Sequence, residues 1–149
     1  MAPCGLVVLA SLLLRGPDGQ VAKVLQSCEG VRQGDPLAPL LFALSMKAIY
    51  GAVSEHGGGR VRLVAVHDDL TILGPPAQVA RCHDLYKALT QEAGLSLQPR
   101  KSVALWVHGP LAQEHADWVR MAGVRLERNS IVLGSPVGGD VDQMRELAA

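Results

Sequence analysis

Two apolar runs of strand length, Val61–Val66 and Leu70–Leu73, flank a short polar break that contains Asp68 and Asp69. Runs of this length, rich in β-branched residues and separated by so few residues, predict a tight β-hairpin. Two adjacent carboxylates near its tip repel each other unless a hard cation such as Mg²⁺ neutralises them. An isolated Asp-Asp pair is more often an ordinary turn, so this pair alone does not establish a metal site.

The size and composition of the chain predict one domain. Its 149 residues can bury a sizeable core, which Leu, Val and Ala must fill because only 3% of the residues are aromatic. The 14 basic and 14 acidic residues cancel, so the chain has no overall electrostatic attraction to nucleic acid. Cys4, Cys28 and Cys82 are scattered and odd in number, which predicts free thiols rather than disulfides or a zinc site.

The N-terminal segment predicts a second hairpin. Leu12–Arg15 and Val21–Ser27 flank Gly16–Gly19, whose sequence Gly-Pro-Asp-Gly is typical of a turn. Asp18 belongs to this turn for backbone reasons and is not a candidate catalytic acid. The apolar run Leu6–Leu14 is too short to span a bilayer, and no basic segment precedes it, which argues against a secretory signal.

A long helix is predicted over Pro36–Ser54, with Asp35 as its cap and Pro36 in its first turn. Gly30 and Gly34 permit a sharply bent loop in front of it. A helix with two apolar stripes is expected to be central and buried. The stripes are Leu37, Leu40, Leu41, Leu44 and Ala48 on one side, and Phe42, Met46, Ile49 and Val53 on the other.

The second half of the chain predicts alternating helices and strands. The fold class that follows is α+β, with an antiparallel sheet that carries the Asp-Asp hairpin and packs on two long helices. The further elements expected are a helix over Ala77–Ala93 that stops at Gly94, a strand over Val103–Val107, a helix over Leu111–Ala122 that stops at Gly123, a hairpin of Val124–Leu126 and Ile131–Leu133 around Arg128-Asn129, and a short helix over Asp140–Ala149.

The order of three motifs resembles the palm of reverse transcriptases, most of all those of retroelements without long terminal repeats and of group II introns. The motifs are Gly30-Val-Arg-Gln-Gly-Asp-Pro-Leu-Ala-Pro-Leu-Leu-Phe42, the Asp-Asp hairpin, and Gly94-Leu-Ser-Leu-Gln-Pro-Arg-Lys-Ser102. The resemblance covers about residues 12–138, where Ile131–Gly138 is similar to the next short hairpin of the family. It implies that residues 1–149 form a single partial reverse transcriptase domain with a palm-like antiparallel sheet.

The resemblance implies an RNA-directed DNA polymerase, which transfers a nucleotide from a dNTP to a primer 3′-hydroxyl with two Mg²⁺ ions, or Mn²⁺ in their place. RNA template, DNA primer and dNTP are then the expected partners, with no membrane. Asp68 and Asp69 match the metal-binding catalytic pair. Lys101 matches the lysine near the triphosphate, a proton donor to the leaving group. The loop beside template and nucleotide is matched by Gln33, Gly34, Asp35 and Pro36.

Three departures from the family qualify this interpretation. Val66 stands where the family has an aromatic residue, and His67 follows it. The family's upstream catalytic aspartate has no match, and most of the fingers and thumb has none either. The chain is therefore expected to be a fragment that is inactive alone, since one carboxylate pair does not bridge two ions. The resemblance to this family implies that the protein resides in the nucleus or the cytoplasm.

Two other function classes compete. A metal-dependent hydrolase could use Asp68, Asp69 and a histidine such as His67 or His108, but the histidines lack ligand spacing. A non-catalytic remnant of a retroelement could keep the fold and bind RNA or a protein. The basic residues of the chain are dispersed, which does not favour RNA binding. Exposed apolar surface would instead favour a protein partner. Metal binding at the acid pair distinguishes the polymerase fragment from the remnant.

Overall fold

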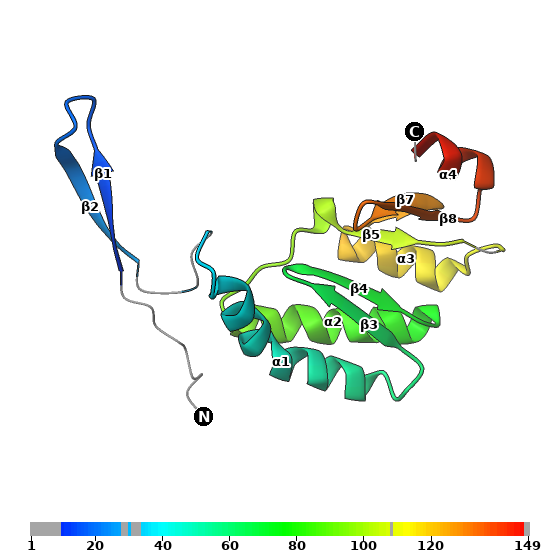
Figure 1. Ribbon diagram of the computed structural model, residues 1–149. Helices are drawn as coiled ribbons and strands as arrows, with labels where there is room; N and C mark the ends of the chain where they lie inside the picture. Colours follow the sequence, from blue (N-terminus) through cyan, green and yellow to red (C-terminus); the bar gives the residue numbers. More distant parts are fainter. Residues whose placement is uncertain (1–9, 28–29, 31–33, 108, 148–149) are drawn as a thin grey trace.

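The computed structural model describes residues 10–27, 30, 34–107 and 109–147 (Figure 1). These residues form a mixed α+β fold, which agrees with the expected class at this level. Their strands make four two-stranded sheets, three antiparallel and one parallel, rather than one continuous antiparallel sheet. The elements are β1 (Ala10–Arg15), β2 (Val21–Ser27), α1 (Ala38–His56), β3 (Arg62–Val66), β4 (Asp69–Leu73), α2 (Pro76–Glu92), the 3₁₀ turn η1 (Pro99–Lys101), β5 (Val103–Leu105), α3 (Gln113–Ala122), β6 (Arg125–Glu127), β7 (Asn129–Val132), β8 (Ser135–Gly138) and α4 (Val141–Leu147).

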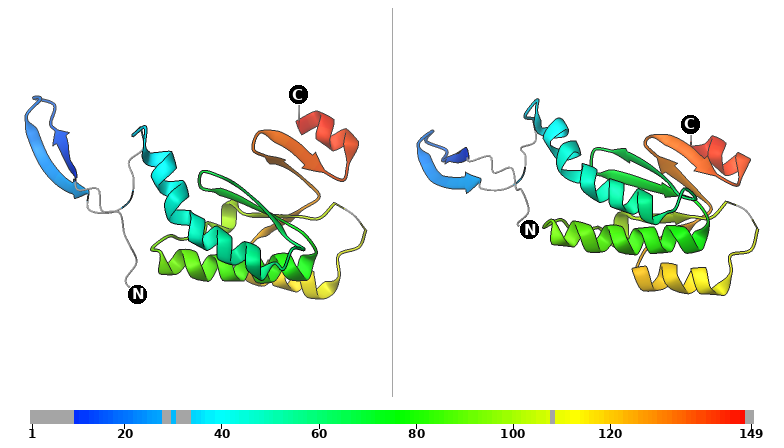
Figure 2. Two further views of the ribbon diagram at one scale, coloured as in Figure 1. Left: turned by 60° about the horizontal axis from the view of Figure 1, so that its bottom comes forward. Right: turned by 90° about the horizontal axis from the view of Figure 1, so that it is seen from below.

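The central layer of the fold is the β3–β4 hairpin on the helices α1 and α2 (Figure 2). In the antiparallel register Leu63 pairs with Ile72 and Ala65 with Leu70, so these side chains share one face. Leu63, Leu70 and Ile72 are half-buried on that face and pack against the core between hairpin and helices. This arrangement confirms the predicted hairpin and its two supporting helices.

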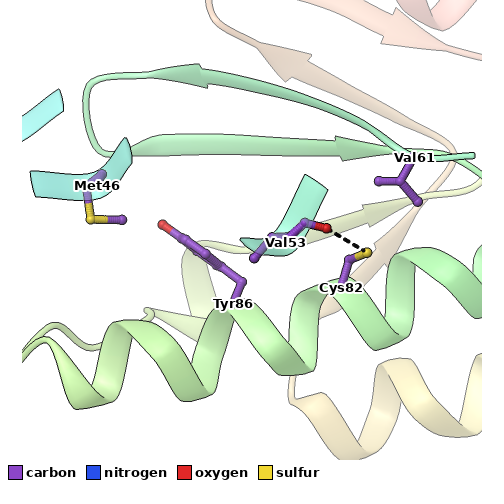
Figure 3. Close-up of a cluster of buried hydrophobic side chains, with 5 residues drawn as sticks. All are labelled: Met46, Val53, Val61, Cys82 and Tyr86. Carbon is purple, nitrogen blue, oxygen red and sulfur yellow. Dashed lines mark hydrogen bonds between the residues drawn. The ribbon is translucent and has the colours of Figure 1, made fainter. Parts of the chain in front are cut away.

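Five buried side chains make up the core, which we call the hairpin core: Met46, Val53, Val61, Cys82 and Tyr86 (Figure 3). They come from α1, α2 and the residue before β3, so the core ties all three parts together. The Cys82 thiol donates a hydrogen bond of 3.6 Å to the Val53 carbonyl. Burial raises the pKa of this thiol, which is free as predicted. Cys4 and Cys28 lie outside the described residues.

Helix α1 differs from its prediction because only one of its apolar stripes is buried. Met46 and Val53 are buried, whereas Leu40 and Leu44 on the other stripe are 56% and 58% exposed. No described element covers this second stripe, so the expectation of a central, buried helix is wrong. The helix nevertheless forms, since one apolar stripe is enough to hold it on α2 and β3.

Asp35 acts just before α1 rather than as its cap. Its carboxylate accepts a hydrogen bond of 2.8 Å from the Leu37 N–H, and its carbonyl accepts one of 3.0 Å from the Ala38 N–H. The cap position itself is Leu37, two residues later than predicted. Asp35 therefore stabilises the turn that leads the chain into the helix.

Helix α2 ends where the sequence predicts. Gly94 has a φ of +79°, which favours glycine, and its N–H bonds the Gln91 carbonyl at 3.0 Å. The Leu95 N–H bonds the Thr90 carbonyl at 2.8 Å, which completes a Schellman motif. Helix α3 stops in the same way at Gly123, whose φ is +69°.

The predicted hairpin of Val124–Leu126 and Ile131–Leu133 is wrong. Strand β6 instead pairs in parallel with β5, with α3 as the crossover between them. Strand β7 turns at Leu133 and Gly134, which have φ angles of +50° and +80°, and pairs with β8. Two residues with positive φ make the tight turn that an antiparallel hairpin needs, and Arg128-Asn129 does not supply it.

The predicted N-terminal hairpin is present as β1 and β2, and it stands away from the rest of the described chain (Figures 1 and 2). At its turn, the Asp18 carboxylate accepts a hydrogen bond of 3.1 Å from the Gln20 N–H, which confirms its backbone role. In the part of the chain that the structure describes, no helix has the length and apolar character of a membrane span.

Replacing Met46 by Ala should lower the free energy of unfolding by about 2–5 kcal/mol, since its side chain is only 2% exposed in the hairpin core. Met121→Ala is the matched control, because that side chain is 81% exposed, and its effect should stay within about 0.5 kcal/mol. Urea unfolding followed by circular dichroism measures both. Equal losses in the two variants would contradict the hairpin core described above.

Candidate functional site

The carboxylate pair lies at the turn end of the β3–β4 hairpin. His67 and Asp68 form the two-residue turn, and His67 has a φ of +54°. This conformation costs a non-glycine residue roughly 1–2 kcal/mol, which the hairpin must offset. The sequence predicts both acids in the break between the strands. The structure instead makes Asp69 the first residue of β4, where it pairs with Val66.

The two carboxylates are exposed and differ in direction. By the alternation of the strand, Asp69 belongs to the hairpin face opposite the hairpin core, together with Val66 and Val64. Asp68 belongs to the turn itself. Both are exposed, so a dissolved cation or a phosphate-bound metal can reach them without any rearrangement of the core.

Two tyrosines support the hairpin from below. Tyr50 of α1 and Tyr86 of α2 stack with ring centroids 6.2 Å apart and planes at 22°. The Tyr50 hydroxyl is buried and has no hydrogen-bond partner among the described residues. Burial raises the pKa of Tyr50. Burial and the neighbouring Tyr50 together raise the pKa of Tyr86 to about 12, and the negative charge of Asp68 adds to both shifts. Both phenols therefore lie within electrostatic reach of Asp68.

Sequence reasoning missed this pair of tyrosines as part of the site. Neither Tyr50 nor Tyr86 is among the site residues that the sequence predicts. The one sequence signal was that the chain has just two tyrosines, and one falls on each of the two helices that were predicted to support the hairpin. Their joint position under the turn depends on the packing of α1 against α2, which the sequence pattern does not specify.

The loop before α1 is described only in part. Gln33 lies outside the described residues. Gly34 has a φ of +89°, and a Cβ there would meet no atom within 4 Å, so backbone conformation rather than crowding requires this glycine. Asp35 is half-buried and engaged in the turn described above, whereas Pro36 is exposed.

Lys101 is exposed at the end of η1. Its segment is anchored to the same core as the carboxylates, because Leu97 packs against the hairpin core. Among the hydrogen bonds and ion pairs of the described residues, none joins Lys101 or Asp35 to Asp68 or Asp69. The structure thus places the two carboxylates at one end of the hairpin, without a hydrogen bond or ion pair to the other predicted site residues that it describes.

The acid pair fits a hard cation in chemistry but offers an incomplete set of ligands. Carboxylate oxygens suit Mg²⁺, which keeps several waters and takes one or two protein carboxylates in phosphate-transfer sites. The described residues contain no group of three or more His, Cys, Asp or Glu side chains placed to hold one metal ion. A metal at this turn would be held by Asp68 and Asp69, with its remaining ligands from water, nucleotide or other segments.

Comparison with known proteins points to a retroelement. The chain is 36% identical over 87 residues to the "Retrovirus-related Pol polyprotein from type-1 retrotransposable element R2" of Nasonia vitripennis. The similarity covers 52% of this chain and 8% of that polyprotein, so the chain is distantly similar to a small part of it. No protein-family model matches the chain. No solved structure matches it either.

Raising the pH from 10 to 12 should lower the free energy of unfolding, and Tyr86→Phe should remove part of that loss. The pKa of Tyr86 is about 12 in the folded chain, whereas the pKa of an ordinary tyrosine, as in the unfolded chain, is 10.0. As the pH rises, the unfolded state therefore loses its proton before the folded state does. The neutral Tyr86 phenol makes its full contribution to the free energy of unfolding below pH 10, and this contribution is lost as the pH rises toward 12. Urea unfolding at several pH values measures the effect. Parallel losses in both proteins would contradict a buried Tyr86 phenol.

Proposed function

We propose that this chain is part of an RNA-directed DNA polymerase and that Asp68 and Asp69 hold a catalytic Mg²⁺ ion. The observation that carries the proposal is an exposed carboxylate pair at a hairpin turn, in a chain distantly similar to a retrotransposon Pol polyprotein. The order of motifs around the hairpin supports it, because it resembles that of reverse transcriptases without long terminal repeats.

The site supports nucleotidyl transfer because its two negatively charged carboxylates can hold a metal ion beside the reacting phosphates. Mg²⁺ supplies neutralisation of the phosphate oxygens and lowers the pKa of an attacking hydroxyl. The role of this chain is to hold two carboxylates at the solvent edge, where a primer end and a triphosphate can approach. The hairpin core fixes the strands, so the turn and the start of β4 present the two acids in one arrangement.

The remaining assignments are part of the same proposal. Lys101 is assigned as a proton donor to the leaving pyrophosphate, supported by its exposure and by the anchoring of its segment through Leu97. Gly34, Asp35 and Pro36, with Gln33, are assigned to the side of the template and the incoming nucleotide. Mn²⁺ is expected to substitute for Mg²⁺, since both accept carboxylate and water ligands.

A two-ion mechanism needs more ligands than the described residues provide. In-line transfer uses two metal ions that are bridged by shared ligands. Asp68 and Asp69 account for one ion, so we assign the further carboxylate to another part of the larger polymerase. By this account the chain works as one piece of a larger polymerase.

Primer extension on an RNA template with Mg²⁺ tests the proposal, with the chain compared with its Asp68→Ala, Asp69→Ala double variant. We expect no extension by the chain alone, because it holds only one of the two ions. Extension that is lost in the double variant would contradict this one-ion account and show a complete site. Extension that persists in the double variant would contradict the assignment of the acid pair. Asp18→Ala, at the other hairpin turn, is the matched control.

A further inference from the structure

A small cavity lies where helix α2, the segment that follows it and helix α3 meet. The two helices lie side by side (Figures 1 and 2). Residues of α2, of the segment 96–102, of the end of α3 and of the entry to β6 line the cavity, whose volume is about 50 Å³. Neither Asp68 nor Asp69 lines this cavity, which we call the α2 cavity, so it is distinct from the carboxylate pair.

The polar lining of the α2 cavity is basic or neutral. His83, Lys87 and Gln91 come from α2, and Ser96 and Ser102 come from the segment after it. No Asp or Glu among the described residues lines the cavity. Lys87 forms no ion pair with another residue that the structure describes. A cavity with cationic groups and no carboxylate attracts an anion.

Three of these side chains have donors that are free to bind a ligand. In the described part of the chain, the Lys87 ammonium, the Gln91 amide and the Ser96 hydroxyl donate no hydrogen bond. The Ser102 hydroxyl, by contrast, donates to the Gln98 carbonyl at 3.1 Å. A tetrahedral oxyanion can accept hydrogen bonds from all three free donors, and its charge strengthens each of them.

His83 is held in a fixed orientation at the side of the cavity. Its ring meets the ring of Trp118 edge-on, with centroids 5.1 Å apart and planes at 85°. Its Nδ1 lies 3.2 Å from the Asp84 carboxylate, which also accepts a hydrogen bond of 3.3 Å from the Trp118 indole N–H. The His83 Nε2 is therefore the nitrogen left for a ligand, and its position is set before the ligand arrives.

We propose that the α2 cavity binds the phosphate group of inorganic phosphate or of a phosphate monoester. A buried water needs about 10–15 Å³ of such a volume, so the cavity holds about three to five groups of that size. This matches one tetrahedral phosphate and excludes a whole nucleotide. Leu97, Pro99 and Val124 add apolar lining, which lowers the local dielectric and strengthens the attraction between Lys87 and the anion. The proposal does not depend on the polymerase function.

Titration of inorganic phosphate into the ¹⁵N-labelled chain tests the proposal, at constant ionic strength and without divalent metal ions. We expect saturable chemical-shift changes at the Ser96 and Ser102 amides. Lys87→Gln should weaken the binding roughly tenfold, because it removes the cation and keeps a side chain of similar length. Lys47→Gln, which changes an exposed lysine of α1, is the matched control and should leave the dissociation constant unchanged.

Two further measurements separate the cavity from a general attraction to positive charge. Ala122→Val should abolish phosphate binding, because the added methyl groups occupy the cavity while the charge of the chain stays the same. Circular dichroism checks that this variant folds; if it does not, the other comparisons still decide. Methyl phosphate should bind at least tenfold more tightly than dimethyl phosphate, because the monoester offers more charge and one more free oxygen.

Four results would each overturn the proposal. They are shifts that do not saturate, equal weakening by Lys87→Gln and Lys47→Gln, unchanged binding by a folded Ala122→Val variant, and equal affinities for the two phosphate esters.

Discussion

The packing of one hairpin on two helices is the interaction on which the described structure depends. Val53 and Cys82 are fully buried where α1 crosses α2, and Val61 covers them at the entry to β3. This contact fixes the direction in which the hairpin leaves the core and hence where its turn lies. The turn and the first residue of β4 can then carry two exposed carboxylates, and the core offsets the cost of the positive φ at His67. The core therefore holds the acid pair in position. This arrangement is typical of functional residues.

Local signals in the sequence predicted the local structure well. The alternation of apolar residues around Asp68-Asp69 predicted the hairpin, and Gly94 and Gly123 marked two helix ends because only a residue that tolerates positive φ closes them in this way. Features that depend on distant segments were less predictable. The pairing of β6 with β5 requires the α3 crossover, and the exposure of the second stripe of α1 depends on which segments are present to cover it.

The candidate site was predictable to the same extent. The pattern of the chain identified Asp68 and Asp69 as a pair, and the structure places both, exposed, at the turn end of the hairpin. The sequence pattern could not show that Asp69 lies in β4, because the register of a strand can shift by one residue without any change in composition. The contribution of Tyr50 and Tyr86 beneath the turn arises from helix packing alone, and so it became visible only in three dimensions.

Paramagnetic broadening by Mn²⁺ in a ¹⁵N-labelled sample tests most directly whether this hairpin is a metal site. Mn²⁺ shortens the relaxation of nearby nuclei, so the broadened amides locate the ion. We predict broadening centred on His67, Asp68 and Asp69 that disappears in the Asp68→Asn, Asp69→Asn variant and persists in Asp18→Asn. Broadening centred on other acids, such as Asp140 and Asp142, or unchanged in the double variant, would contradict the assignment of the acid pair as the metal site.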